Sequence, residues 1–227
     1  MDRRQFLSVS GLAATTPLFA NASPGSPAPE DGLFQRTDFT SDGLGLDPRE
    51  YTTLLQQATA SGNLQADNYS NGGLIAQLEQ TFARLLGKEA AMFVPTGTLA
   101  NHIAVRMLAG NDRRVLVQAE SHLYNDSGDC AQTLSGLNLV PLAEGSSTVD
   151  LDEVKRWVER TAQGRVELKV GAISIESPVR RKDHQSVDFD ELERVCRYAR
   201  EQGIRLHLDG ARLFNLPQHT GKSVKAY

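Results

Sequence analysis

Apolar residues recur at helical spacing in several parts of the chain. The clearest case is the stretch 74–86, whose apolar stripe consists of Leu74, Leu78, Phe82, Leu85 and Leu86. This spacing predicts an amphipathic helix, and Gly87 is the residue type that commonly ends one. Asp150 and Glu153 resemble the start of a capping box. Further helices are predicted over 49–60, 99–108, 150–161 and 188–202, with a helical stretch through Ala131.

Short apolar runs of strand length alternate with these helices. They cover residues 90–94, 115–118, 137–142, 170–175 and 204–208. This order predicts an α/β fold in which a mostly parallel sheet is sandwiched by helices. Ligands bind at the carboxyl ends of the strands in such sheets, so the residues that follow each run are the candidates for chemistry.

The first residues are typical of an export signal. Arg3 and Arg4 precede a mildly apolar stretch over 9–20, and an Ala-x-Ala cleavage site ends at Ala22. This pattern indicates twin-arginine export to the periplasm or the medium, and the stretch is too short for a transmembrane helix. A cytosolic chain with a chance arginine pair is the alternative. Three parts are expected: a signal peptide (1–22), a Pro/Ser/Gly linker (23–31) and a folded domain (32–227).

Composition narrows the function classes. The chain has 227 residues, of which 40% are hydrophobic, and a net charge of −4. Without a basic stripe, a nucleic-acid partner is not expected, and neither is a membrane partner once the signal is removed. Cys130 and Cys196 cannot form a metal cluster by themselves, so no metal is expected. Cys196 lies on the apolar face of the helix over 188–202, which predicts a buried thiol, although a disulfide remains open.

Two segments carry residues suited to a charged ligand. The strand over 204–208 delivers Asp209 and Arg212 into a loop at its carboxyl end. After the run 90–94, the residues Thr96, Gly97 and Thr98 begin a helix, whose free N–H groups and positive dipole end suit a phosphate. An ordinary threonine N-cap with a glycine turn explains these three residues equally well.

The strings at 86–98 and 206–215 closely resemble the threonine aldolase and β-eliminating lyase superfamily. The resemblance covers residues 36–227, roughly the N-terminal two-thirds of a family enzyme. It implies pyridoxal 5'-phosphate (PLP) as cofactor, with Asp209 at the pyridine nitrogen and Arg212 on the carboxylate of an amino acid substrate. It also implies that Thr96, Gly97 and Thr98 hold the phosphate.

The resemblance extends to four more residues. His122 matches the family histidine that stacks on the pyridine face, and an imidazole suits general acid–base work at a substrate hydroxyl. Tyr69 matches a loop tyrosine that contacts the cofactor, although a structural aromatic is the alternative. Ser41 matches a serine that meets the substrate carboxylate. Glu176 ends the strand over 170–175 and is expected to face the substrate. The residues after His122 and Glu176 depart from the family pattern, which leaves substrate specificity open.

These residues together imply a PLP-dependent carbon–carbon lyase that cleaves a β-hydroxy-amino acid such as threonine to glycine and an aldehyde. A β-eliminating amino acid lyase is the alternative, as is a non-catalytic exported binding protein that retains the pocket. The family also uses a lysine that binds the cofactor covalently, and neither Lys222 nor Lys225 has its context. We therefore expect a fragment that is inactive alone, from a complete protein that forms a homodimer or homotetramer.

Overall fold

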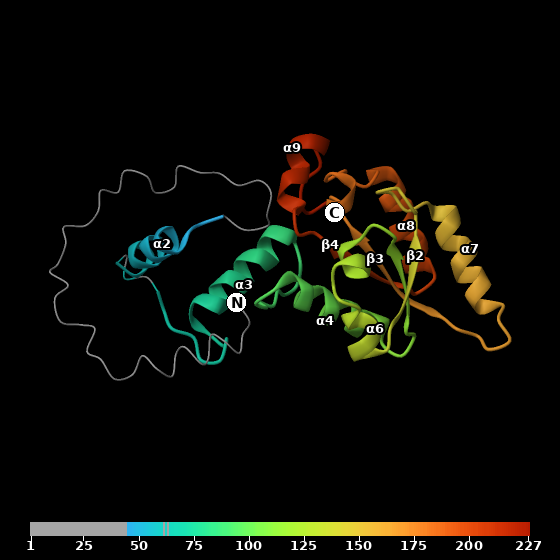
Figure 1. The fold of residues 1–227 in the computed structure, drawn as a ribbon, viewed down its shortest axis with the longest axis horizontal. Coiled ribbons are helices and arrows are strands. Elements are labelled where there is room, and N and C mark those ends of the chain that lie inside the picture. Colours follow the sequence, from blue (N-terminus) through green and yellow to red (C-terminus); the bar gives the residue numbers. More distant parts are fainter. Residues whose placement is uncertain (1–44, 61, 63) are drawn as a thin grey trace, which may run out of the picture. The chain divides into compact units, whose positions relative to one another are not determined.

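The structure is a computed structural model that describes residues 45–60, 62 and 64–227. The predicted signal peptide, the linker and Ser41 lie outside the described residues. The chain divides into two units, residues 1–63 and 64–227. The helix α2 (Pro48–Ala60) belongs to the first unit, and all other described elements belong to the second (Figure 1). The limits of the predicted domain over 32–227 stay a prediction.

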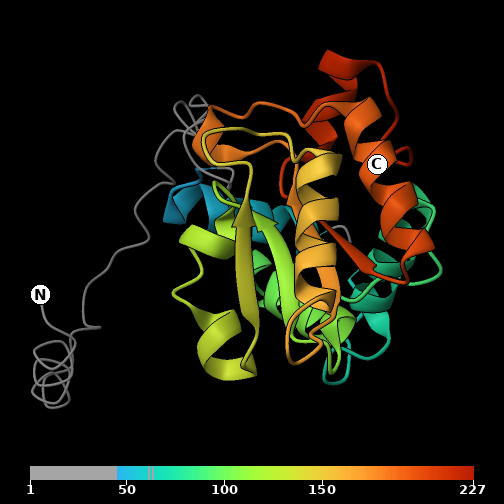
Figure 2. The ribbon, with the colours of Figure 1, turned by 90° about the vertical axis from the view of Figure 1, so that its right-hand side faces the viewer.

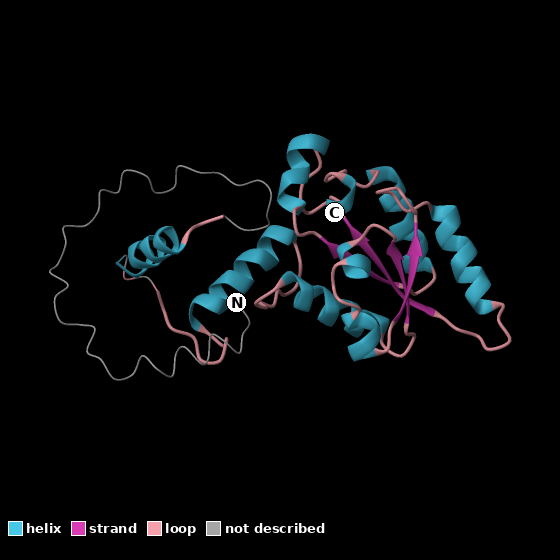
Figure 3. Ribbon diagram, viewed as in Figure 1, coloured by secondary structure: helices cyan, strands magenta, loops and turns pink. Residues whose placement is uncertain are grey.

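The second unit is built on a parallel sheet. Its strands are β1 (Arg114–Gln118), β2 (Asn138–Leu142), β3 (Val170–Glu176) and β4 (Arg205–Asp209), in the spatial order β2-β1-β3-β4. Every pairing is parallel, which confirms the predicted fold class (Figure 3). The chain runs from β1 to β2 on one side and then crosses to β3 on the other. The order therefore reverses between β1 and β3, where sheets of this kind bind ligands.

The helices of this unit are α3 (Gly73–Leu86), α4 (Gly97–Ala109), α5 (His122–Asn125), α6 (Cys130–Ser135), α7 (Leu151–Ala162), α8 (Phe189–Glu201) and α9 (Leu216–Thr220), with 3₁₀ turns η1 (Arg180–Lys182) and η2 (Leu213–Asn215). Four of them, α4, α6, α7 and α8, cover the two faces of the sheet. One buried cluster packs β1 and β3 against α7 and α8, which lie side by side in Figure 2. A second cluster packs the other face against α4 and α6. The sheet thus forms the middle of three layers.

The start of β3 shows how closely these layers approach. A Cβ atom added to Gly171 would lie 2.0 Å from the backbone oxygen of Asp112 and 2.6 Å from that of Ala109. Because both obstacles are backbone atoms, only glycine fits between the end of α4 and this strand. All seven residues of β3 are buried, as expected for a central strand covered on both faces.

The predicted start of α7 is confirmed in part. Asp150 accepts hydrogen bonds from the backbone N–H groups of Asp152 (2.7 Å) and Glu153 (3.2 Å) and so caps the helix. The Glu153 carboxylate accepts instead from the N–H of Ala143 at 3.0 Å. The cap is therefore present, while Glu153 ties the helix to the end of β2.

One expectation about secondary structure was wrong. Residues 90–94 form no strand in the described chain, because neither sheet edge pairs with them, and Met92 is 66% exposed. An apolar run of this length becomes a strand only beside a hydrogen-bonding neighbour. The helical stretch through Ala131 is confirmed as α6, which is separated from the short helix α5 because Gly128 and Asp129 both adopt positive φ.

Both cysteines are free thiols, and each is partly exposed. Cys196 packs against the cluster that α8 forms with the sheet, but it is only partly buried, whereas its apolar neighbours predicted a buried thiol. Burial raises the pKa of its thiol, so the uncharged form is favoured. Among the described helices, none combines the length and apolar character needed to cross a membrane.

Candidate active site

The carboxyl ends of β3 and β4 place two buried carboxylates beside each other. Glu176 and Asp209 are register partners on these strands, and neighbouring strands lie about 4.8 Å apart. Glu176 is 3% exposed, and burial is the main reason why the pKa of its carboxyl group is raised. The negative charge of Asp209 adds to this rise, whereas hydrogen bonds from the backbone of Arg180 and His122 oppose it. The strand ends therefore concentrate negative charge in a poorly hydrated place.

The Asp209 carboxylate is fixed by a residue of α4. The side-chain nitrogen of Asn101 donates to Asp209 Oδ2 at 2.6 Å, and the backbone N–H of Ala211 donates to Oδ1 at 3.2 Å. Asn101 lies four residues after Gly97, which is about 6 Å along a helix. The carboxylate and the first turn of α4 are thus one helical turn apart. Sequence reasoning missed Asn101, although its helical spacing from Gly97 was a usable signal.

The first turn of α4 is open in front of Gly97. Thr96 caps the helix, because its hydroxyl accepts from the N–H of Leu99 at 3.2 Å. The first N–H groups of a helix have no intrahelical partner, so those near Gly97 and Thr98 are suited to an anion. A Cβ atom added to Gly97 would meet no atom within 4 Å. The turn thus has both the threonine cap and the free space that a phosphate requires.

His122 is the first residue of α5 and follows β1 closely. Its backbone N–H donates to Glu176 Oε2 at 2.6 Å, and Ser121 caps this short helix. The Ser127 hydroxyl donates to the His122 carbonyl oxygen at 3.1 Å and lies 3.5 Å from the ring atom Nδ1. The structure therefore brings His122 next to Glu176, whose strand neighbour is Asp209. Neither Ser127 nor the backbone contact with Glu176 could be inferred from sequence spacing.

The remaining predicted residues differ in placement. Arg212 is half-buried in the turn after β4, three residues beyond Asp209. Tyr69 lies in a turn with φ of 52° and is 99% exposed, so the structure does not bring it to the others. Asp209, His122, Glu176 and the first turn of α4 are brought together. The contacts of Tyr69 with a cofactor, and of Arg212 and Glu176 with a substrate, stay predictions.

A second histidine lies beneath Asp209. The Ser174 hydroxyl and His207 Nδ1 are 2.9 Å apart, on the neighbouring strands β3 and β4. Burial lowers the pKa of His207, and the negative charge of Asp209 opposes this shift only in part. The neutral imidazole is therefore favoured, and His207 adds little positive charge beside Asp209.

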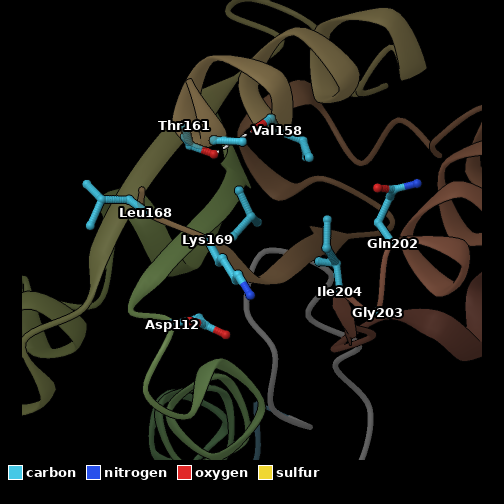
Figure 4. A pocket seen from close by; sticks show the side chains of 10 residues that line it. Asp112, Val158, Thr161, Leu168, Lys169, Gln202, Gly203 and Ile204 are labelled. Carbon is cyan, nitrogen blue, oxygen red and sulfur yellow. Dashed lines mark hydrogen bonds between the residues drawn. The ribbon is translucent and has the colours of Figure 1, made fainter. Parts of the chain in front are cut away.

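A pocket of about 360 Å³ opens at the opposite end of the sheet (Figure 4). Its lining includes Asp112, Lys169, Val170 and Ile204, which lie at or just before the first residues of the strands. The seven residues of β3 separate this pocket from Glu176 by about 20 Å. The two carboxylates, the imidazole and the helix N-terminus described above lie at the other end of the sheet, not in this pocket. The candidate site is therefore at the carboxyl ends of the strands.

Comparisons with known proteins show which family this chain is similar to. The family model described as beta-eliminating lyase matches residues 38–227. The low-specificity L-threonine aldolase 1 of Arabidopsis thaliana is 27% identical over 185 residues, which are 77% of this chain and 51% of the relative. The low specificity L-threonine aldolase of Escherichia coli O157:H7 is 29% identical over 160 residues, 70% of this chain and 46% of the relative.

A solved structure is similar as well. It is a Listeria monocytogenes protein provisionally described as an L-allo-threonine aldolase, 34% identical with a TM-score of 0.68. The match covers 80% of this chain and 49% of that one. The chain thus spans about half the length of the relatives it matches. Because the family model covers most of the sequence and the sheet has the expected fold, the chain belongs to the beta-eliminating lyase family.

Proposed function

We propose that this chain is the cofactor-binding part of a PLP-dependent carbon–carbon lyase that cleaves a β-hydroxy-amino acid such as threonine to glycine and an aldehyde. The observation that carries the proposal is the hydrogen bond between Asn101 and Asp209. It fixes a buried carboxylate one helical turn from the open N-terminus of α4. A negative group at one end and a phosphate cradle at the other suit a small cationic ring that bears a phosphate.

The residues present fit PLP at three points. The first turn of α4, with Thr96, Gly97 and Thr98, would hold the phosphate, and Asp209 would face the pyridine nitrogen. His122 would lie against the ring, because its backbone N–H is hydrogen-bonded to Glu176, the strand neighbour of Asp209. When bound, PLP supplies an electron sink for negative charge that develops at the substrate Cα.

The protein's own groups would orient the reactants and handle protons. The buried negative charge of Asp209 favours a protonated ring nitrogen, because an opposite charge nearby stabilises the charged form. Arg212 would bind the substrate carboxylate through paired N–H donors, which fixes the orientation of the bond to be broken. His122 would exchange a proton with the substrate β-hydroxyl oxygen. Burial of the strand ends keeps water away from these interactions.

A β-eliminating amino acid lyase is the second candidate, because it would use the same binding residues and the matching family model is described by that activity. The names of the Arabidopsis and E. coli relatives favour the carbon–carbon lyase. For the complete protein we also propose a homodimer or homotetramer. Export by the twin-arginine route to the periplasm is proposed from residues 1–22 alone.

The proposal is tested by binding of pyridoxamine 5'-phosphate to this chain. The probe lacks the aldehyde of PLP, so it does not react with surface lysines. We expect measurable binding by calorimetry, and a loss of at least about tenfold in affinity for Asp209→Asn, which equals about 1.4 kcal/mol. Pyridoxamine without the phosphate should bind still more weakly, because the first turn of α4 is then empty.

The matched control is Asp152→Asn, a change to an exposed carboxylate on α7. It should bind the probe as the unchanged chain does. Absence of binding to the unchanged chain, or equal affinities for Asp209→Asn and the control, would overturn the proposed function.

A further inference from the structure

We propose that Glu176 is a positioning residue, whose buried carboxylate joins the segment that carries His122 to the turn that carries Arg180. This role rests on the proposed function, in which His122 works at the cofactor. It differs from the direct substrate contact predicted for Glu176, because the residue would act through the backbone of its neighbours.

Both oxygens of the Glu176 carboxylate are engaged by backbone groups. Oε2 accepts from the N–H of His122 at 2.6 Å, and Oε1 accepts from the N–H of Arg180 at 2.9 Å. Hydrogen bonds to an ionised acceptor are stronger than neutral ones. With only 3% of the residue exposed, the carboxylate is shielded from a substrate in the crevice. Its geometry therefore serves to fix two chain segments.

Gln118 holds the backbone of Glu176 in place. Its side-chain oxygen accepts from the backbone N–H of Glu176 at 2.6 Å, and its side-chain nitrogen donates to the backbone carbonyl oxygens of Glu176 (3.1 Å) and Ser147 (2.6 Å). The ladder between β1 and β3 ends one residue earlier, at Val117 and Ser174. The side-chain amide of Gln118 thus takes the place of the next backbone hydrogen bonds between β1 and β3. The two strands can therefore separate here while the backbone polar groups of Glu176 remain hydrogen-bonded.

This separation occurs where the strand order of the sheet reverses. His122 follows β1 and Arg180 follows β3, so the two segments leave the sheet on either side of the opening. The Glu176 carboxylate bridges the two segments by accepting from the backbone N–H of His122 and from that of Arg180. Its length and position therefore determine how far the start of α5 stands from the end of β3.

A second contact joins the same two segments nearer the surface. Nε and Nη2 of Arg181 donate to the two oxygens of Asp126 at 3.0 and 2.7 Å. This hydrogen bond from Arg181 is the main reason why the pKa of the Asp126 carboxyl is lowered. Asp126 follows α5 directly, and Arg181 lies in η1. The segments of His122 and Arg180 are therefore joined by two contacts, the buried Glu176 carboxylate and the Arg181–Asp126 pair nearer the surface.

The test is amide hydrogen exchange by NMR on the full chain and its Glu176→Gln variant. Glutamine preserves the shape but has one acceptor oxygen for two N–H donors, so one bond must be lost. We expect the protection of the His122 or Arg180 amide to fall at least about tenfold, equivalent to about 1.4 kcal/mol of local opening. The amide of Leu116 in β1 should be unchanged, which separates local loosening from global loss of stability.

Glu153→Gln is the matched control, because Glu153 also accepts from a backbone amide, that of Ala143, but on α7. Glutamine keeps one acceptor oxygen, which is enough for this single donor, so the protection of both the Ala143 and the His122 amides should change little. Asp126→Asn provides a milder variant at the surface, expected to reduce His122 protection less than Glu176→Gln does. Unchanged protection of both His122 and Arg180 in a folded Glu176→Gln variant would overturn the positioning role.

Probe binding separates this role from the proposed function. In Glu176→Gln, the affinity for pyridoxamine 5'-phosphate should change little, whereas the induced circular dichroism of the bound ring should change because His122 shifts. If the unchanged chain does not bind the probe, the proposed function fails while the exchange result still decides whether Glu176 fixes the segment. If exchange is unaffected but binding persists, only the positioning role fails.

Discussion

The sheet and the helix α3 both carry apolar residues at regular spacing, yet they differ sharply in packing. Leu116 in β1 is fully buried, and every residue of β3 is buried. In α3, none of the described residues is buried, and Leu78 and Leu85 remain 37% and 44% exposed. A groove of about 460 Å³ lies beside this helix, lined by Phe82 and by residues of β4. Periodicity therefore predicts which face is apolar, whereas the packing depends on what covers that face.

The proposed site draws on both of these regions. Asp209, Glu176 and His122 belong to the strand ends, where the polar groups are buried and hydrogen-bonded. Gly97 follows the exposed segment after α3, which is tied back by a hydrogen bond from the N–H of Phe93 to Glu79 at 2.8 Å. We infer that the groups proposed to surround a pyridine ring are held by tight packing, whereas the proposed phosphate site depends on a less tightly packed segment.

The largest expected effect comes from removing matched leucines in the two regions. Leu116→Ala should lower the free energy of unfolding by about 3–5 kcal/mol, since it leaves a cavity in the buried cluster. Leu78→Ala should cost less than about 1.5 kcal/mol, because its side chain is already partly in water. Urea unfolding curves measure both. Equal losses would show that α3 is packed as tightly as the sheet and would remove the contrast.

A smaller effect is expected at the junction between the regions. Asn101→Ala removes the donor to the buried Asp209 carboxylate and should lower the free energy of unfolding by about 1.5–3 kcal/mol. Thr96→Ala removes the cap of the same helix on its exposed side and should cost about 1 kcal/mol. The same unfolding measurement compares them. A greater loss for Thr96→Ala than for Asn101→Ala would place the more important anchor of α4 at its exposed start.

The smallest effect concerns the dependence of stability on pH. Burial raises the pKa of Glu176 above its usual 4.5, so the folded protein keeps a proton that the unfolded chain has already lost. Stability from this group is therefore full below pH 4.5 and declines as the pH rises through the folded pKa. Glu176→Gln should lose this decline, apart from a constant offset, in urea unfolding measured at pH 4, 5, 6 and 7. A decline that persists unchanged in the variant would assign it to another group.

The surface pair of Asp126 and Arg181 should change stability with pH in the opposite direction to Glu176. The pKa of Asp126 is lowered from 3.8, so its contribution is present above that pH and is lost as the pH falls through the folded pKa. Asp126→Asn should therefore flatten the acid side of the stability profile, and above pH 5 it should lower stability by an amount that does not vary with pH. An acid-side decline that persists unchanged in the variant would contradict this assignment.

Local patterns were sufficient for much of this protein. Apolar runs and helical spacing predicted the four strands that form the sheet, and they placed Asp209, Glu176 and the residue pair at Gly97 and Thr98 at element ends. They succeeded because burial on both sides of a parallel sheet requires continuous apolar strands, and because each strand end leads into a loop. The run 90–94 has the same character, but a strand also needs a hydrogen-bonding neighbour, which a local pattern does not contain.

The sequence by itself determined the alternating elements, the parallel sheet and the carboxyl-end residues, since each follows from the spacing of neighbouring side chains. Only the tertiary structure decided which of those residues touch. Asn101 and Asp209 are 108 positions apart, and Gln118 and Glu176 are 58 apart. Pairs of this kind arise because folding brings α4, β1, β3 and β4 to one edge, where buried polar groups must find partners that are distant in the chain.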